Sequence, residues 1–111
     1  MSDTKRLSES EQEAIFQRFI DMFGEESQQL IAIEEMSELT KELSKNLWRD
    51  GDCKSKTAKR TQNIQEEIAD VLITVRCLRY MFGTDEIDRM IDTKLKRGLE
   101  RIEKRQEENK Q

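Results

Sequence analysis

Two short acidic stretches have the residue types needed for chemistry: "EEMSELT" at residues 34–40 and "EEIADVL" at residues 66–72. Each contains two glutamates, an apolar residue, a small residue, a carboxylate and another apolar residue. Like charges three or four residues apart on a helix repel each other by about 0.2–0.5 kcal/mol per pair. The first question is therefore whether Lys41 and Lys45 neutralise the first stretch, or whether a bound cation does.

Helical periodicity places the two stretches in the same phase. At about 100° per residue, Glu35 and Glu38 flank the apolar stripe of one predicted helix. Glu67 and Asp70 flank the stripe of another helix on the same side and by the same angles. If the two helices pack stripe to stripe, these four carboxylates share one seam. Carboxylates this close either take up protons or are held by a cation.

The absence of histidine restricts which cation that could be. A chain with no histidine and two cysteines has no Ser-His-Asp triad, no Cys-His nucleophile, no histidine zinc site and no four-cysteine zinc site. Any metal site must therefore consist of oxygen ligands, which favours Mg²⁺, with Mn²⁺ as a possible substitute. The alternative is that both stretches are solvated helix faces, because Glu-x-x-Glu is common on polar helices.

The elements that carry these stretches are predicted to be four long helices. Proline is absent and glycine is rare, so little interrupts helical structure. We expect helices at 8–23, 25–48 and 58–82, a loop at 49–57, and a fourth helix whose tail frays from about residue 103. Ser8 with Glu11 and Ser10 with Glu13 are possible capping boxes, and Gly24 is a plausible stop. Thr84 is the expected cap of the fourth helix.

The fold class predicted from this pattern is all-α: an antiparallel four-helix bundle forming a single domain over residues 1–111. Only 34% of the residues are hydrophobic and 40% are charged, which leaves a thin core. The third predicted helix carries a second uncharged side formed by Ala69, Ile73, Cys77 and Tyr80. We expect this side to meet another subunit in a homodimer or homotetramer. The alternative is a central helix wrapped by the rest of its own chain.

Composition also restricts the setting and the partners. The net charge of −4 argues against non-specific binding of nucleic acid. No apolar run is long enough to span a bilayer and no signal-peptide pattern begins the chain, so we expect no membrane association. Cys53 and Cys77 do not resemble a disulfide framework, which favours a reduced, cytoplasmic protein.

The two acidic stretches resemble a known signature. "EEMSE", followed after 28 residues by "EIAD", is similar to the E-E-x-x-E…E-x-x-D pattern of the MazG-like all-α nucleoside triphosphate pyrophosphohydrolases. The similarity covers the second to fourth predicted helices, and the gap between the motifs is long for the family. The resemblance implies Mg²⁺-dependent cleavage between the α and β phosphates, giving a nucleoside monophosphate and pyrophosphate.

The resemblance also implies roles for individual residues. It makes Glu35, Glu38, Glu67 and Asp70 the metal ligands. Glu34 matches the leading motif glutamate and would be a further ligand or would orient the attacking water, so Glu34 and Glu35 are the catalytic candidates.

Substrate contacts are expected from two other places. The stretch "KLKRGLERI" is similar to the family's last helix, so Lys94 and Arg97 are candidates for contacting phosphates. Trp48 is a candidate for stacking on the base, and a core or capping role for it is equally plausible.

The function expected from the sequence is a house-cleaning nucleotide pyrophosphohydrolase acting on a (deoxy)nucleoside triphosphate. A phosphoribosyl-ATP pyrophosphatase-like activity is the alternative within the enzyme class. The alternative outside it is a non-enzymatic helical interaction module whose glutamates only keep it in solution. A metal ion bound between the two glutamate-rich helices would discriminate the enzyme from the module.

Overall fold

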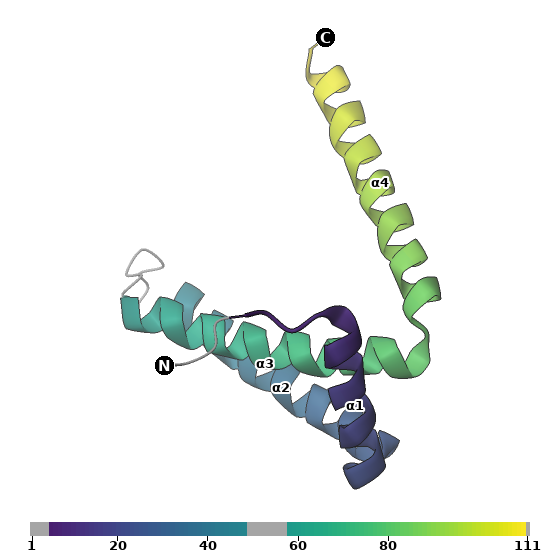
Figure 1. The fold of residues 1–111 in the computed structure, drawn as a ribbon. Coiled ribbons are helices and arrows are strands. Elements are labelled where there is room, and N and C mark those ends of the chain that lie inside the picture. The colour runs from purple at the N-terminus through teal and green to yellow at the C-terminus, as the bar shows by residue number, and fades with distance from the viewer. Residues whose placement is uncertain (1–4, 49–57, 111) are drawn as a thin grey trace. The chain divides into compact units, whose positions relative to one another are not determined.

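The computed structural model describes residues 5–48 and 58–110, and all regular structure within these ranges is α-helical (Figure 1). The all-α class predicted from the sequence is therefore confirmed. The helices are α1 (Glu9–Phe23), α2 (Glu25–Trp48), α3 (Ala58–Phe82) and α4 (Thr84–Asn109). The loop predicted at 49–57 lies outside the described residues. No helix in the described part of the chain is long and apolar enough to cross a membrane.

The ends of α1 follow the sequence signals. Ser8 caps the helix, because its hydroxyl accepts from the Glu11 amide at 3.1 Å and its own amide donates to the Glu11 carboxylate at 2.8 Å. This is the first of the two capping boxes considered, and Ser10 lies inside the helix. Gly24 ends α1 with φ of 91°, a backbone conformation that costs glycine little. Its amide donates to the Ile20 carbonyl at 2.8 Å, and α2 begins at the next residue.

The start of α4 differs from the prediction. Thr84 is the first residue of the helix and not its cap, because Gly83 holds the cap position with φ of 122° and no side chain caps the helix. At the other end the helix extends to Asn109, and the fraying expected from about residue 103 stays a prediction. The final turns consist of good helix formers, and Lys110 forms an ion pair with Glu107 at 4.0 Å.

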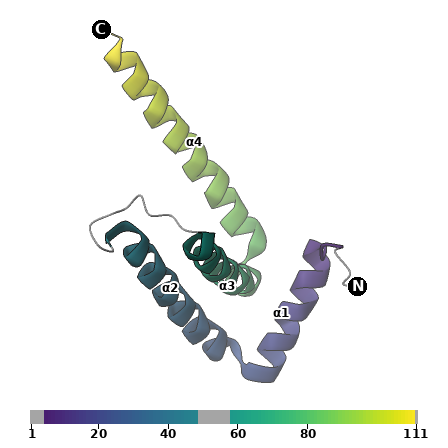
Figure 2. The ribbon, with the colours of Figure 1, turned by 90° about the vertical axis from the view of Figure 1, so that its left-hand side faces the viewer.

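The chain divides into two compact units, Met1–Met81 and Phe82–Gln111, which are described separately. The first unit holds α1, α2 and nearly all of α3, and the second is essentially α4. Within the first unit, α2 runs beside α3 and α1 lies against the C-terminal half of α3 (Figures 1 and 2). Of these helices, α2 and α3 carry the two acidic stretches.

The buried centre of the first unit lies where α1 and α2 meet α3. Phe16, Ala32 and Cys77 are 6%, 1% and 1% exposed. The ring of Phe16 lies 6.5 Å from that of Tyr80, and the Tyr80 hydroxyl donates to the Gln17 side-chain oxygen at 2.6 Å. Cys77 is therefore covered by its own chain, and our expectation that it faces another subunit was wrong. Tyr80 is half-buried against α1, while Ala69 and Ile73 of the same side remain exposed, so contact of these two residues with another subunit stays a prediction.

The main apolar stripe of α3 remains partly exposed as a consequence. Because α1 packs on the Cys77 side, Ile68, Leu72 and Val75 each keep about two-fifths of their surface accessible. Apolar side chains of α2 are exposed to a similar degree. Met36, Leu43 and Leu47 each keep two-fifths or more of their surface accessible.

Candidate metal centre

Three carboxylates from two helices converge beside the α2–α3 contact. Glu35 of α2 and Glu67 and Asp70 of α3 each offer an oxygen atom, and these atoms all lie within 4.8 Å of one another. Glu67 and Asp70 point the same way because residues three apart share a helix face. Glu35 and Glu67 are half-buried and Asp70 is exposed. We call these three residues the acidic triad.

The pairing of the two helices explains why these three residues meet. The Cys77 thiol donates to the Gln28 side-chain oxygen at 3.8 Å, and Glu35 lies beside Asp70. Residue numbers therefore rise along α2 as they fall along α3. In this register Glu38, the fourth predicted ligand, lies one turn beyond Glu35 and opposite Glu67. It is not one of the three residues whose oxygen atoms converge.

The triad concentrates negative charge. Removal from solvent raises the pKa of Glu67 first, and the charges of Asp70, Glu35, Glu38 and Glu42 raise it further. Burial is also the main cause of the raised pKa of Glu35, followed by Asp70 and the glutamates near it on α2. Within the described residues, every charge that shifts the pKa of Glu35 or Glu67 is another carboxylate. The folded chain therefore favours protonation of these groups or the binding of a cation.

One carboxylate oxygen of the triad lacks a hydrogen-bond partner in the part of the chain that the structure describes. Oε2 of Glu67 is shielded from solvent and forms no hydrogen bond within the described residues. A buried polar atom left in this state costs free energy. A divalent cation among the three carboxylates would satisfy it, and oxygen ligands of this kind suit Mg²⁺ or Mn²⁺. The side chains present therefore fit the hard cation expected from the sequence.

Lys45 does not neutralise the triad. Its ammonium group contacts Glu42 at 3.5 Å, one turn along α2, and Glu42 belongs to the charges that raise the pKa of Glu67. A lysine therefore offsets the charge of the outer glutamate of α2. Among the described residues, the charges that act on Glu35 and Glu67 are all negative.

The other predicted site residues are more dispersed. Glu34 is exposed beside the triad and its charge contributes to the raised pKa of Glu35. Trp48 is the last residue of α2, and its predicted stacking on a base lies outside what the structure describes. Lys94 and Arg97 are exposed one turn apart on α4, where both line a shallow depression of about 340 Å³ along that helix.

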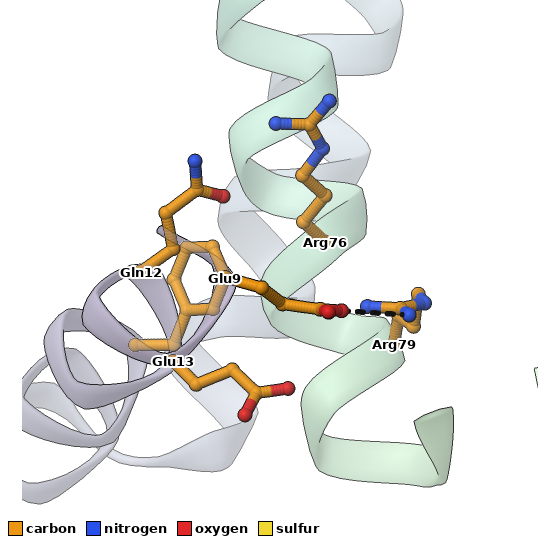
Figure 3. Close-up of a pocket in the computed structure, with 6 residues that line it drawn as sticks. Glu9, Gln12, Glu13, Arg76 and Arg79 are labelled. Carbon is orange, nitrogen blue, oxygen red and sulfur yellow. Dashed lines mark hydrogen bonds and ion pairs between the residues drawn. The ribbon is translucent and has the colours of Figure 1, made fainter. Parts of the chain in front are cut away.

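A cavity between α1 and α3 was not anticipated from the sequence. It measures about 350 Å³ and is lined by charges of both signs, with Glu9 of α1 opposite Arg79 of α3 (Figure 3). These two side chains form an ion pair at 3.0 Å, and Arg76 lies one turn earlier on α3. In the sequence, the feature that could have indicated this cavity is the pair of arginines three residues apart on α3, Arg76 and Arg79. Since the cavity's charges offset each other, we assign it to the attachment of α1.

The raised pKa values predict how the metal-free protein responds to pH. Above the ordinary value of 4.5, the folded state holds protons on Glu67 and Glu35 that the unfolded state has released. The free energy of unfolding should therefore fall as pH rises through this window. Glu67→Gln should melt at a higher temperature than wild type at neutral pH, and the difference should shrink toward pH 4.5.

Melting curves in chelator across this pH range would test that expectation. Glu66→Gln is the matched control, because Glu66 is the adjacent glutamate and is exposed. A difference between wild type and Glu67→Gln that stays constant with pH would contradict the assignment of a raised pKa to Glu67.

Comparison with known proteins adds no assignment: no protein-family model, curated protein or solved structure matches the chain.

Proposed function

We propose that this protein is a Mg²⁺-dependent nucleoside triphosphate pyrophosphohydrolase of the MazG-like type. It would cleave the bond between the α and β phosphates and release a nucleoside monophosphate and pyrophosphate, in a house-cleaning role. The observation that carries the proposal is the convergence of Glu35, Glu67 and Asp70 with an unpartnered buried oxygen among them. This arrangement supports a metal site of the kind that the sequence signature implies.

The chemistry divides among a few side chains. Glu35, Glu67 and Asp70 would hold the cation, and Glu38 lies one turn away as a further ligand. When bound, Mg²⁺ would lower the pKa of the attacking water and offset charge on the phosphates. Glu34 would accept a hydrogen bond from that water and orient it toward phosphorus. A P–O bond from the water's oxygen would form as the P–O bond to the leaving pyrophosphate breaks, and the water's proton would pass by way of the Glu34 carboxylate to solvent.

The active form would be a homodimer or homotetramer in the cytoplasm, with the helices completing an antiparallel bundle. Exposed apolar side chains support this assembly. Ile68 and Leu72 on α3, and Leu95 and Leu99 on α4, each keep two-fifths or more of their surface accessible. Burial stabilises by about 25 cal/mol per Å² of apolar surface. A second copy that covers these apolar side chains would therefore add buried apolar surface to the small core of the single chain.

A nucleotide panel tests the proposed activity directly. The protein is incubated with Mg²⁺ and each common ribo- or deoxynucleoside triphosphate, or with phosphoribosyl-ATP, and pyrophosphate release is measured. We expect pyrophosphate and monophosphate from at least one nucleoside triphosphate, and none in chelator. Release of inorganic phosphate alone, or no product from any compound together with no metal binding, would contradict the proposal.

The basic residues of α4 give a second kinetic test. We propose that Lys94 and Arg97 contact the phosphates. Charge-assisted hydrogen bonds contribute roughly 1.5–3 kcal/mol, so Arg97→Ala and Lys94→Ala should each lower kcat/KM about tenfold to hundredfold at saturating Mg²⁺. Mg²⁺ affinity measured without nucleotide should not change. Exposed charges without a ligand are worth under about 1 kcal/mol, so wild-type kinetics in both variants would mean that other residues bind the phosphates.

A non-enzymatic helical interaction module is the second candidate. The observation that favours it is the long apolar stripe of α4, where Met90, Leu95, Leu99 and Ile102 are all more than half exposed. Such a stripe is typical of helices that pack on a partner. A module of this kind has no requirement for Mg²⁺, so metal binding by the triad separates the two candidates.

A further inference from the structure

We infer that α4 pairs antiparallel with the α4 helix of a second copy of this chain, in the register that sets Leu95 of each copy against Gly98 of the other. The inference rests on the homo-oligomer that the proposed function includes, not on the proposed activity, and it names the surface and the geometry of the assembly. It concerns α4 by itself, a helix that has no buried side chain along its described length.

One face of α4 has the spacing of a helix that packs along another helix. Six residues follow one another at alternating intervals of three and four, which keeps them on one side of the helix. They are Asp88, Ile91, Leu95, Gly98, Ile102 and Arg105. The apolar side chains among them are exposed, with Leu95 at 67% and Ile102 at 57%. We call this face the α4 seam.

The charges of α4 select the orientation of the pair. The seam begins at Asp88 and ends at Arg105. The surrounding charges divide in the same way: residues 84–93 carry four carboxylates and one arginine, whereas residues 94–105 carry six basic groups and two glutamates. Parallel helices in register would set like charges against each other. Antiparallel helices set the acidic part of each copy against the basic part of the other, which favours a second copy as the partner of this face.

Three layers of the seam define the register. In an antiparallel pair, setting Asp88 against the partner's Arg105 places Ile91 against the partner's Ile102 and Leu95 against the partner's Gly98. The two-fold axis of the pair repeats each layer. Opposite charges therefore meet in the outer layers, two apolar side chains meet in the next, and a large residue meets a small one nearest the axis.

Gly98 is the feature that favours close contact between the two helices. Glycine is disfavoured in the interior of a helix, yet Gly98 lies inside α4 and on the seam. A Cβ at this position would meet no atom within 4 Å among the residues that the structure describes, so packing within the chain does not require a glycine here. In the pair, the missing side chain lets the backbones approach and leaves space for the partner's Leu95.

Exchange of the charged layer tests the orientation. Asp88→Arg and Arg105→Asp each put two like-charged contacts into the antiparallel pair. The dissociation constant of the full-chain assembly, measured by sedimentation equilibrium, should therefore rise about tenfold or more. The chain with both substitutions restores opposite charges in these layers and should recover most of the wild-type affinity. Lys96→Asp, which changes an exposed charge away from the seam, is the matched control for Arg105→Asp and should alter the dissociation constant little.

Gly98→Leu tests the close contact. Leucine is a better helix former than glycine, and it adds apolar surface, so non-specific association through this face should become stronger. In the inferred register the new side chain occupies the space of the partner's Leu95, so the dissociation constant should instead rise about tenfold or more. Circular dichroism should show unchanged or increased helix content. Thr93→Leu, at an exposed position on the other side of α4, is the control and should not weaken the assembly.

The outcomes separate the pairing from the function on which it rests. A wild-type chain that is monomeric overturns both the pairing and the proposed homo-oligomer, while the nucleotide panel still decides the activity. An assembly that the charge variants and Gly98→Leu leave unchanged overturns the α4 pairing alone. Single charge variants that weaken the assembly without recovery in the double variant overturn the antiparallel register. Should a charge variant lose helix content, Gly98→Leu decides, because its added Cβ meets no atom of its own chain within 4 Å in the described residues.

Discussion

Asp70→Asn should abolish turnover while leaving the helical fold intact. Asp70 offers one of the three converging oxygen atoms, and its charge is the largest electrostatic contribution to the raised pKa of both Glu35 and Glu67. An amide in its place binds a hard cation poorly. Metal ions supply several kcal/mol of transition-state stabilisation, and 1.36 kcal/mol corresponds to tenfold in rate. We therefore expect kcat to fall about a thousandfold or more.

The same substitution should raise the melting temperature of the metal-free protein. It removes a charge that destabilises two neighbouring carboxylates in the folded state. Asp21→Asn is the matched control, because Asp21 is an exposed carboxylate on α1 that accepts a hydrogen bond from Gln17 at 2.8 Å. It should change neither activity nor the response to metal. Wild-type turnover by Asp70→Asn would contradict the assignment of Asp70 as a metal ligand.

Local signals in the sequence predicted the helices well, because each boundary rests on nearby residues. The Ser8 capping box and the Gly24 stop are formed as expected, since both depend on the chemistry of one or two side chains. The side of α3 that is covered could not be predicted, because it depends on where α1 folds back, and that is set by tertiary contacts such as Phe16 with Tyr80.

The triad was predictable for a different reason. Glu67 and Asp70 must share a face because they lie on one helix, and the matched phase of α2 points Glu35 at them. The axial register of the two helices was not available from the sequence. That register separates Glu38 from the converging oxygen atoms, and it also buries Gln28 against Cys77. No periodicity identifies a buried glutamine, so the burial of Gln28 could not be predicted from the sequence.

Mg²⁺ or Mn²⁺ should raise the melting temperature of the wild-type protein, and Glu67→Gln should lose nearly all of this effect. A ligand that binds only the folded state stabilises it by about 2.7 kcal/mol at a hundredfold excess over Kd. Each kcal/mol corresponds to about 4–8 °C for a domain of 60–100 residues, so a shift of roughly 10–20 °C is expected. Glu67 should matter most, because a bound cation would satisfy its otherwise unpartnered Oε2.

Glu38→Gln separates the three-residue site from the four-residue site implied by the family signature. If Glu38 joins the ligands when the cation binds, its variant should lose a substantial part of the metal-induced shift. If Glu38 acts only through its charge, the shift should fall slightly, because that charge raises the pKa of Glu35 and Glu67 and attracts the cation over a short range. Equal shifts in the wild type, Glu67→Gln and Glu38→Gln, measured by differential scanning calorimetry with and without chelator, would mean that the ions act non-specifically and that α2 and α3 hold no metal site.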